Sequence, residues 1–304
     1  MKSVLISGAS GLIGQQLSKR LKAEGYEVRM LSRKKSNPYF YWDPAKQEID
    51  EKAFENLDAI IHLAGAAISK KWTNSYKKEL YESRVNAAEF LFEKAKKLNT
   101  TIKTFITASG VNYYGTETTD KVFDEKDPHA DDFLGNLCFD LEKSAKKFES
   151  MGARVCAVRT AAVLSTDGGM LKELRPLANK NLLSPLGFGK QIVPWIHIDD
   201  LVNLYVYLLE NKNLSGAYNA VGTQIITNRD FSYALAENLN KKIILPAVPG
   251  FVLKIVLGEM SAILLQGSAV SNSKIKNEGF EFQFEEIEAA FQDLFNKKTA
   301  ESSG

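Results

Sequence analysis

The chain has few cysteines and no long uninterrupted apolar run. Its 304 residues include 2 cysteines, Cys138 and Cys156. They lack metal-ligand spacing and are too few for a disulfide framework, so we expect no metal site and a reduced, cytoplasmic environment. The longest apolar stretch, residues 251–265, is broken by a lysine, a glycine and a glutamate. We interpret it as a buried or cleft-lining helix rather than a membrane span.

The chain also lacks a strong charge of either sign. Its 39 lysines and arginines nearly balance its 37 aspartates and glutamates, for a net charge of +2. This balance argues against nucleic acid or an anionic membrane surface as the main partner. An apolar run typical of a core strand begins at Val4, so we expect no secretion signal. The hydrophobic share of 44% and charged share of 25% are typical of a globular protein of one large or two domains.

Three glycines near the start of the chain carry the first functional signal. Gly8, Gly11 and Gly14 follow the apolar run and open an amphipathic segment that Gly25 ends. A strand, a glycine turn and a helix in this order leave backbone N–H groups free to bind a diphosphate. The alternative is an ordinary glycine turn before a helix, but a second apolar strand at 27–31 completes a βαβ unit. We therefore expect a dinucleotide cofactor.

Apolar runs alternate with helical patterns through the first half of the chain. This alternation predicts an α/β fold, a Rossmann-type doubly wound parallel sheet with helices on both faces. We expect strands at 4–7, 27–31, 59–63, 104–107 and 154–159, and helices that include 83–98 and 134–150.

The pattern changes after residue 165 and predicts a smaller, mostly helical C-terminal lobe. Residues 192–200 suggest a return to the main sheet, 216–221 a further strand, and 243–245 another strand-like piece. We assign 1–165 and 190–226 to the NAD(P)-binding domain, and 166–189 and 227–304 to a substrate-side lobe.

Residues at the strand ends suggest the cofactor and the reacting groups. Ser32 and Arg33 follow the second strand, where a basic residue would accommodate the 2′-phosphate of NADP and an acidic one the ribose of NAD. An exposed basic turn is the alternative; we favour NADP. His62 lies between two apolar residues and is interpreted as a packed strand residue. Asp199 and Asp200 are interpreted as N-terminal caps of a helix.

A run of small polar residues and tyrosines follows the fourth strand. A hydroxyl at Ser109 could hold a substrate oxygen, and Tyr113 or Tyr114 could donate a proton. Packing of either tyrosine with its polar tip toward water is the alternative.

Several motifs in order resemble a known family. The Gly8–Gly14 loop, the 62–65 run, the 109–115 run and the 195–201 run follow the order of extended short-chain dehydrogenases/reductases, the nucleotide-sugar epimerase group. Further runs at 63–68, 71–73, 82–85, 257–260 and 279–282 make the chain similar to an atypical subgroup, nucleoside-diphosphate-sugar epimerase-like and of uncertain activity. The resemblance covers nearly the whole chain.

The chain departs from this resemblance at the catalytic pair. The family's Tyr-x-x-x-Lys pair aligns with Leu134 and Cys138, and its following glutamate with Glu142. No tyrosine occurs between Tyr114 and Tyr205, so a small shift cannot restore the pair.

Three explanations could account for the missing tyrosine–lysine pair. Another acid/base could act, either one of the 113/114 tyrosines or Cys138 with a pKa lowered by Arg84, which stands where the family usually has an asparagine. The alternative for Cys138 is an inert thiol packed within a helix. The reaction could need hydride transfer but little proton transfer from the protein. Catalysis could also have been lost, leaving an NADP-binding sensor or scaffold.

The expected function is an NADP-binding oxidoreductase or epimerase for a small hydroxyl or carbonyl substrate; the alternative is a non-catalytic NADP-binding regulatory protein. A homodimer could form through the helices at 83–98 and 134–150. The candidate catalytic residues are Ser109, Tyr113, Tyr114 and Cys138. The expected cofactor contacts are Gly8, Ser10, Gly11, Leu12, Ile13, Gly14, Ser32, Arg33, Leu63, Ala64, Gly65, Arg84 and Thr160.

Overall fold

The computed structural model describes residues 2–301, and their side chains as far as residue 296. The chain divides into two compact units. Unit 1 comprises Met1–Tyr113, His129–Arg159 and Val202–Tyr218; unit 2 comprises Tyr114–Pro128, Thr160–Leu201 and Asn219–Gly304. The division differs from the expected domain bounds, because 114–128, 160–165, 190–201 and 219–226 fall in unit 2.

The main sheet has eight strands in the order β11-β8-β6-β5-β1-β2-β3-β4. Their bounds are β1 (Ser3–Ser7), β2 (Glu27–Ser32), β3 (Tyr39–Asp43), β4 (Glu48–Ile49), β5 (Ala59–His62), β6 (Thr104–Gly110), β8 (Arg154–Thr160) and β11 (Gly216–Ala220). The β1–β2, β1–β5, β2–β3 and β5–β6 pairs are parallel, and β3–β4 is antiparallel.

The direction of winding reverses between β1 and β5. The chain runs from β1 outward through β2, β3 and β4, and then returns to β5 on the other side of β1 before it continues through β6. Ligands of open α/β sheets bind at such a reversal, beyond the carboxyl ends of the strands. This places the expected site at the ends of β1, β5 and β6.

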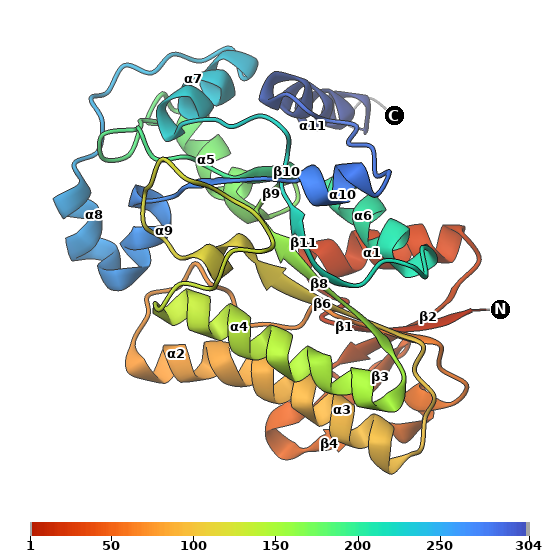
Figure 1. Ribbon diagram of the computed structural model, residues 1–304. Helices are drawn as coiled ribbons and strands as arrows, with labels where there is room; N and C mark the ends of the chain where they lie inside the picture. Colours follow the sequence, from red (N-terminus) through yellow and green to blue (C-terminus); the bar gives the residue numbers. More distant parts are fainter. Residues whose placement is uncertain (1, 302–304) are drawn as a thin grey trace. The chain divides into compact units, whose positions relative to one another are not determined.

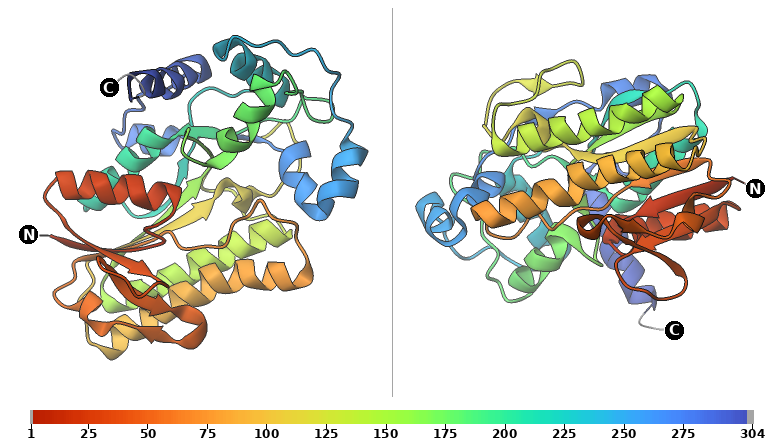
Figure 2. Two further views of the ribbon diagram at one scale, coloured as in Figure 1. Left: turned by 180° about the vertical axis from the view of Figure 1, so that it is seen from behind. Right: turned by 90° about the horizontal axis from the view of Figure 1, so that it is seen from below.

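Helices cover both faces of this sheet. On one face lies α1 (Leu12–Ala23) with the unit 1 part of α6 (Ile198–Glu210), and on the other lie α2 (Asn74–Tyr81), α3 (Ala87–Lys97) and α4 (Phe133–Lys146) (Figure 1). Both views in Figure 2 show α3 and α4 side by side. Leu17 and Leu21 of α1 are buried, and Gly25 follows the helix with a φ of 83° that favours glycine.

Unit 2 contains two small sheets, each of two strands. β9 (Ala162–Leu164) pairs with β10 (Trp195–His197), and β7 (Val122–Phe123) pairs with β12 (Ala269–Val270). Its helices are α5 (Gly169–Asn179), α7 (Asn228–Asn238), α8 (Gly250–Leu257), α9 (Ala262–Leu265), α10 (Ser273–Asn277) and α11 (Ile287–Glu301). Short helical turns elsewhere in the chain are η1 (Pro44–Lys46), η2 (Glu51–Phe54), η4 (Val111–Tyr114), η5 (Lys147–Met151) and η6 (Gly258–Ser261).

The predicted doubly wound sheet is confirmed, and all five predicted strands of its first half are present. Two predictions in the second half were wrong. Residues 195–197 form β10, which pairs with β9 in a separate sheet rather than joining the main one. Residues 243–245 form no strand; the nearest pairing is an isolated bridge between Leu186 and Val248. A short apolar run cannot by itself show which sheet a strand joins.

The apolar stretch 251–265 is neither one helix nor fully buried. It is divided among α8, η6 and α9, and on α8 the side chains of Phe251, Ile255 and Val256 are 66%, 75% and 62% exposed. Of the two alternatives, a buried helix is therefore wrong for α8, and a cleft-lining helix stays a prediction. None of the helices in residues 2–301 has the length and apolar character needed to cross a membrane.

Aromatic packing anchors the helical face of unit 1 formed by α3 and α4. The fully buried ring of Phe148 stacks on Phe105 of β6, with centroids 3.9 Å apart, and meets Phe92 of α3 edge-on at 5.4 Å. These three rings join the sheet to α3 and to η5, the turn that follows α4.

We predict that Phe148→Ala lowers the free energy of unfolding by about 3–5 kcal/mol, because it leaves a cavity among buried rings. Denaturant unfolding measures this change. The matched control is Phe188→Ala, since Phe188 is 94% exposed, and we expect a change within about 0.5 kcal/mol. Equal effects of the two substitutions would contradict this account of the core.

Candidate functional site

The Gly8–Gly14 loop brings the backbones of β1, α1 and β5 into close approach. A Cβ at Gly8 would lie 2.7 Å from the carbonyl carbon of Leu63, and Gly8 has a φ of 72°. A Cβ at Gly14 would lie 2.4 Å from the oxygen of Gly8. Gly11 donates its N–H to the same oxygen at 3.0 Å. Side chains are therefore excluded at Gly8 and Gly14 by backbone atoms that cannot move aside.

The amino end of α1 is open to an anion. Gly11 is the N-cap residue, no side chain caps the helix, and its first turn holds no acidic residue. Leu12 and Ile13 begin the helix, while the carbonyl of Ser10 accepts a hydrogen bond from the Gln15 side chain at 2.8 Å. Unpaired N–H groups at a helix start carry partial positive charge and bind phosphate oxygens. The loop thus fits a dinucleotide diphosphate.

The basic turn after β2 stands beside this loop. Ser32 is the last residue of β2, which pairs with β1, and its hydroxyl accepts the N–H of Lys34 at 3.0 Å. Arg33 is exposed, and among the described side chains no carboxylate pairs with it. Its guanidinium is therefore available to a ligand phosphate.

His62 is buried at the end of β5 and joins three segments. Its Nδ1 lies 2.7 Å from the Ser7 hydroxyl and its Nε2 lies 3.1 Å from the carbonyl oxygen of Arg84. A carbonyl only accepts, so Nε2 carries the proton and Nδ1 accepts from Ser7. The hydroxyl of Ser7 also accepts the N–H of Ala64 at 3.3 Å. Burial lowers the pKa of His62 to about 4, so the predicted packed strand residue is a neutral hydrogen-bonding link.

Arg84 lies in a π-helical turn, η3 (Glu82–Asn86), between α2 and α3. Such turns are rare and often occur at functional sites. The guanidinium covers Gly65, where a Cβ would lie 2.7 Å from its Cζ, and donates to the carbonyls of Ala66 at 2.9 Å and Leu80 at 3.3 Å. The hydroxyl of Ser83 accepts the N–H of Ala66 at 2.9 Å. The loop after β5 is thus held by this turn.

A buried polar chain runs beneath the end of β6. The Ser109 hydroxyl donates to Glu142 of α4 at 2.8 Å, and Arg159 of β8 donates to both carboxylate oxygens of Glu142 at 2.9 Å. The Arg159 guanidinium lies 3.3 Å from the ring centre of Tyr113. Because the O–H group of Ser109 donates its hydrogen bond to the carboxylate, the hydroxyl oxygen can only accept a hydrogen bond from a ligand.

The two candidate tyrosines belong to different units. Tyr113 is in unit 1, where Arg159 covers its ring and His129 meets it edge-on at 5.9 Å. Tyr114 is in unit 2, where its hydroxyl donates to Asn219 at 2.8 Å and its ring stacks on Phe123. Since this hydrogen bond is buried, it favours a packing role for Tyr114 over proton transfer.

The positions aligned with the missing catalytic pair are buried. Leu134 is 2% and Cys138 9% exposed, both on α4. Burial, the largest effect, raises the pKa of the Cys138 thiol to about 11, although Arg84 acts to lower it. The alternative in which Arg84 lowers this pKa is therefore wrong, because desolvation outweighs the nearby cation, and the burial agrees with the alternative of a packed thiol. Thr160, the other expected contact, ends β8 and belongs to unit 2.

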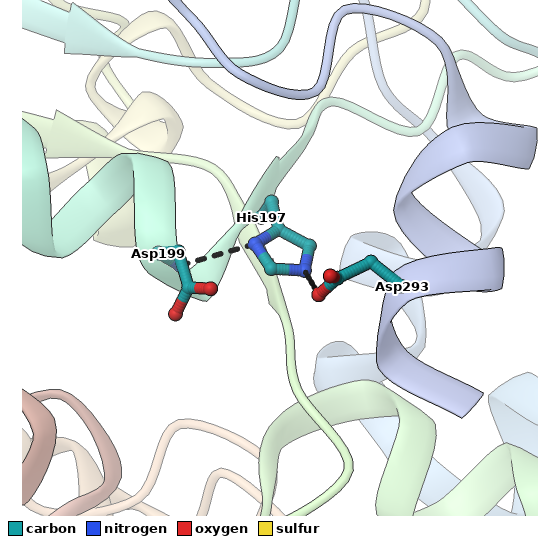
Figure 3. Close-up of side chains that lie close together, drawn as sticks. All are labelled: His197, Asp199 and Asp293. Carbon is teal, nitrogen blue, oxygen red and sulfur yellow. Dashed lines mark hydrogen bonds and ion pairs between the residues drawn. The ribbon is translucent and has the colours of Figure 1, made fainter. Parts of the chain in front are cut away.

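A second polar cluster lies within unit 2. His197 stands between Asp199 and Asp293, and their ligand atoms lie within 4.8 Å of one another (Figure 3). The Nδ1 atom of His197 accepts the Asp199 N–H at 3.1 Å, and Nε2 is 3.3 Å from a carboxylate oxygen of Asp293. With Nδ1 accepting, a neutral ring carries its proton on Nε2, the ring nitrogen that lies nearer Asp293. The geometry favours a histidine–aspartate pair that holds α11 rather than a metal ligand set.

Asp200 does not cap its helix, contrary to expectation. It accepts the N–H groups of Gln283 at 2.8 Å and Phe284 at 3.1 Å, and burial raises the pKa of its carboxyl. The Asp200 carboxylate therefore serves packing within unit 2, whereas the cap role of Asp199 stays a prediction.

Comparison with known proteins places this geometry in a family. A family model described as the NAD dependent epimerase/dehydratase family matches residues 4–221. The chain belongs to this family. A domain of unknown function matches residues 248–294 of the same chain.

Relatives of the epimerase/dehydratase family align along most of their length. An epimerase family protein of Staphylococcus aureus (strain MRSA252) is 31% identical and aligns over 98% of this chain and 100% of its own. An epimerase family protein of Mycobacterium bovis is 35% identical and aligns over 93% of this chain and 94% of its own.

Solved structures that resemble this chain agree with the family assignment. The human epimerase family protein SDR39U1 (isoform 2), determined with NADPH, has a TM-score of 0.86 and 29% identity, covering 96% of this chain and 98% of that one. A nucleoside-diphosphate sugar epimerase from Corynebacterium glutamicum has a TM-score of 0.78 and 28% identity, covering 100% of this chain and 62% of that one. The resemblance inferred from the motifs is confirmed.

Sequence reasoning missed two features of the family site. It aligned Glu142 but did not pair it with Arg159, although an arginine within the apolar run 154–159 indicates a buried partner. It also did not foresee that Arg84 covers Gly65, because the π-turn that presents Arg84 has no simple sequence signature.

We predict that His62 makes unfolding sensitive to acid. The pKa is about 6.5 when unfolded and about 4 when folded, so below pH 6.5 the unfolded chain binds a proton that the native state excludes. The free energy of unfolding should then fall by up to about 3 kcal/mol as the pH drops from 6.5 to 4.

Denaturant unfolding of wild type and His62→Gln across this pH range measures the effect as a difference between the two proteins. His129→Gln is the matched control and should keep the wild-type dependence. An unchanged acid dependence in His62→Gln would rule out this role.

Proposed function

We propose that the chain binds NADP and acts as an oxidoreductase or epimerase on a small substrate with a hydroxyl or carbonyl group. The observation that carries the proposal is the glycine cradle of Gly8 and Gly14 against β5, which excludes any side chain, next to an uncapped helix start. The structure of the human relative with NADPH supports the same cofactor here. A bound nicotinamide supplies or accepts the hydride.

Arg33 favours NADP over NAD. It offers a planar set of donors at the end of β2, the position where the 2′-phosphate is recognised in this class of sheet. Ser10, Gly11, Leu12 and Ile13 would bind the diphosphate, and Ser32 would add a hydroxyl. Leu63, Ala64 and Gly65 would lie along the cofactor beyond β5.

The proposed reacting groups lie at the end of β6. Ser109 would accept a hydrogen bond from a substrate hydroxyl group, since its own O–H group donates to Glu142. Tyr113 is the candidate proton donor of unit 1, and its ring lies under the Arg159 cation. This arrangement differs from a tyrosine paired with a lysine, because Leu134 and Cys138 occupy those positions.

A non-catalytic NADP-binding regulatory protein is the second candidate. The burial of Leu134 and Cys138, and the raised pKa of the Cys138 thiol, favour it. Two experiments separate the candidates: protein loaded with NADPH is given a panel of carbonyl compounds, and protein loaded with NADP+ is given hydroxy compounds and nucleotide-sugars. Oxidation of NADPH, reduction of NADP+ or conversion of a sugar into its epimer supports the enzyme, whereas tight cofactor binding without turnover of any panel member supports the sensor.

A homodimer through α3 and α4 and a cytoplasmic location belong to the same proposal. The first rests on family resemblance and the second on the scarcity of cysteine. Analytical ultracentrifugation and imaging of a fluorescently tagged chain would check them.

We predict that Arg33→Ala weakens NADPH binding about ten- to hundred-fold and leaves NADH binding unchanged, because only NADPH carries the 2′-phosphate. Isothermal titration of both cofactors measures the two affinities. The matched control is Arg20→Ala, which removes an arginine paired with Glu24 on α1 and should change neither affinity. Wild-type protein that binds NADH as tightly as NADPH would refute the assignment of NADP.

A further inference from the structure

Arg84 is a half-buried cation without a counter-charge. Its guanidinium donates to two main-chain carbonyls, those of Ala66 and Leu80, which leaves further N–H donors of its planar group. Within the described part of the chain, no carboxylate forms an ion pair with it. The neighbouring arginine of the site, Arg159, is by contrast fully paired with Glu142.

A partly buried cation without a counter-charge lowers the stability of the folded protein unless a bound ligand supplies the negative charge. Carbonyl oxygens satisfy individual N–H groups but leave the positive charge in place, and removal from water penalises that charge. Burial accordingly lowers the pKa of Arg84. Natural proteins often retain such a cost at ligand sites, where the missing partner arrives with the ligand.

The position of Arg84 points to the reacting end of the site. Its guanidinium lies against Gly65, beyond β5, and its charge acts on Cys138 of α4. The Cys138 thiol lies beside Gly110, where a Cβ would be 3.8 Å from Sγ. β5 lies between β6 and β1 in the sheet, and the segment that follows β5 contacts Gly8 through Leu63 and Arg84 through Gly65. Because Cys138 lies beside Gly110, its interaction with Arg84 brings the guanidinium toward the end of β6, where Ser109 lies.

The chemistry of the neighbouring positions strengthens this assignment. Cys138 stands where the family resemblance places a lysine, so α4 supplies no cation there. Arg84 instead brings a positive charge close to Cys138 from another element, the π-turn η3. A planar guanidinium can bind a carboxylate or phosphate group through two parallel hydrogen bonds.

We propose that Arg84 binds a carboxylate or phosphate group of the substrate, which makes the substrate a small anionic hydroxy or oxo compound. The inference rests on the proposed function, because it names the substrate class of the same site. A single unpaired arginine fits one anionic group better than the diphosphate of a nucleotide-sugar.

The test uses glycolate and ethylene glycol, two probes of similar size of which only the first carries a carboxylate. Each is titrated into the NADP-loaded full chain and into the chain without cofactor, with inorganic phosphate in parallel. The readouts are the NMR signal of the Arg84 Nε–H group and the melting temperature. We expect glycolate or phosphate to shift both, and ethylene glycol to shift neither.

Variants separate a binding role from a structural one. Arg84→Gln should weaken binding of the active anion about ten-fold or more, and Arg84→Lys should lose less because it keeps the charge without the planar donors. Arg20→Gln is the matched control and should bind as wild type. If Arg84→Gln does not fold, the NMR titration of wild type still decides.

Two results would overturn the inference. The first is no shift of the Arg84 signal with either anion. The second is a loss of NADP affinity in Arg84→Gln with no effect of glycolate or phosphate, which would assign the missing anion to the cofactor diphosphate. Failure of wild type to bind NADPH would instead refute the proposed function, and the titration without cofactor would still test Arg84.

Discussion

The close approach of three backbones at the Gly8–Gly14 loop is the constraint on which the site depends. Gly8 lies against the end of β5, and Gly14 lies against Gly8 itself, at separations that leave no room for a Cβ. The contact fixes where α1 starts relative to β1 and β5. The helix start, the loop after β5 and the reversal of winding between these strands therefore occur at one place.

The parts of the fold that depend on local patterns could be predicted from the sequence. Glycine spacing and apolar runs placed β1, α1, β2 and the parallel sheet correctly, because each pattern follows from the geometry of one element. The pairing of β10 with β9 and the exposure of α8 could not be predicted, since they depend on which distant segments pack together. The sequence did suggest a packed thiol at Cys138, but the effect of this burial on its pKa needed the surrounding structure.

Loss of the tyrosine–lysine pair did not leave the site without ionisable groups. Glu142, in register with Cys138 on α4, pairs with Arg159, and the pair holds the Ser109 hydroxyl in one orientation. Each of these groups is already engaged within unit 1, so the chain itself sets the direction of the hydrogen bond that Ser109 can make. Only the position of Glu142 was visible in the sequence; the pairing needed the distance between α4 and β8.

The π-turn at η3 has an evolutionary consequence. Such a turn holds one residue more than the α-helical turn it replaces, so a single-residue insertion or deletion creates or removes it. Within this turn the Arg84 carbonyl accepts a hydrogen bond from the Nε2–H group of His62, and the Arg84 side chain covers Gly65. His62, Gly65 and the length of the segment 82–86 should therefore be inherited together, and a lineage that shortens the turn would be free to replace both residues.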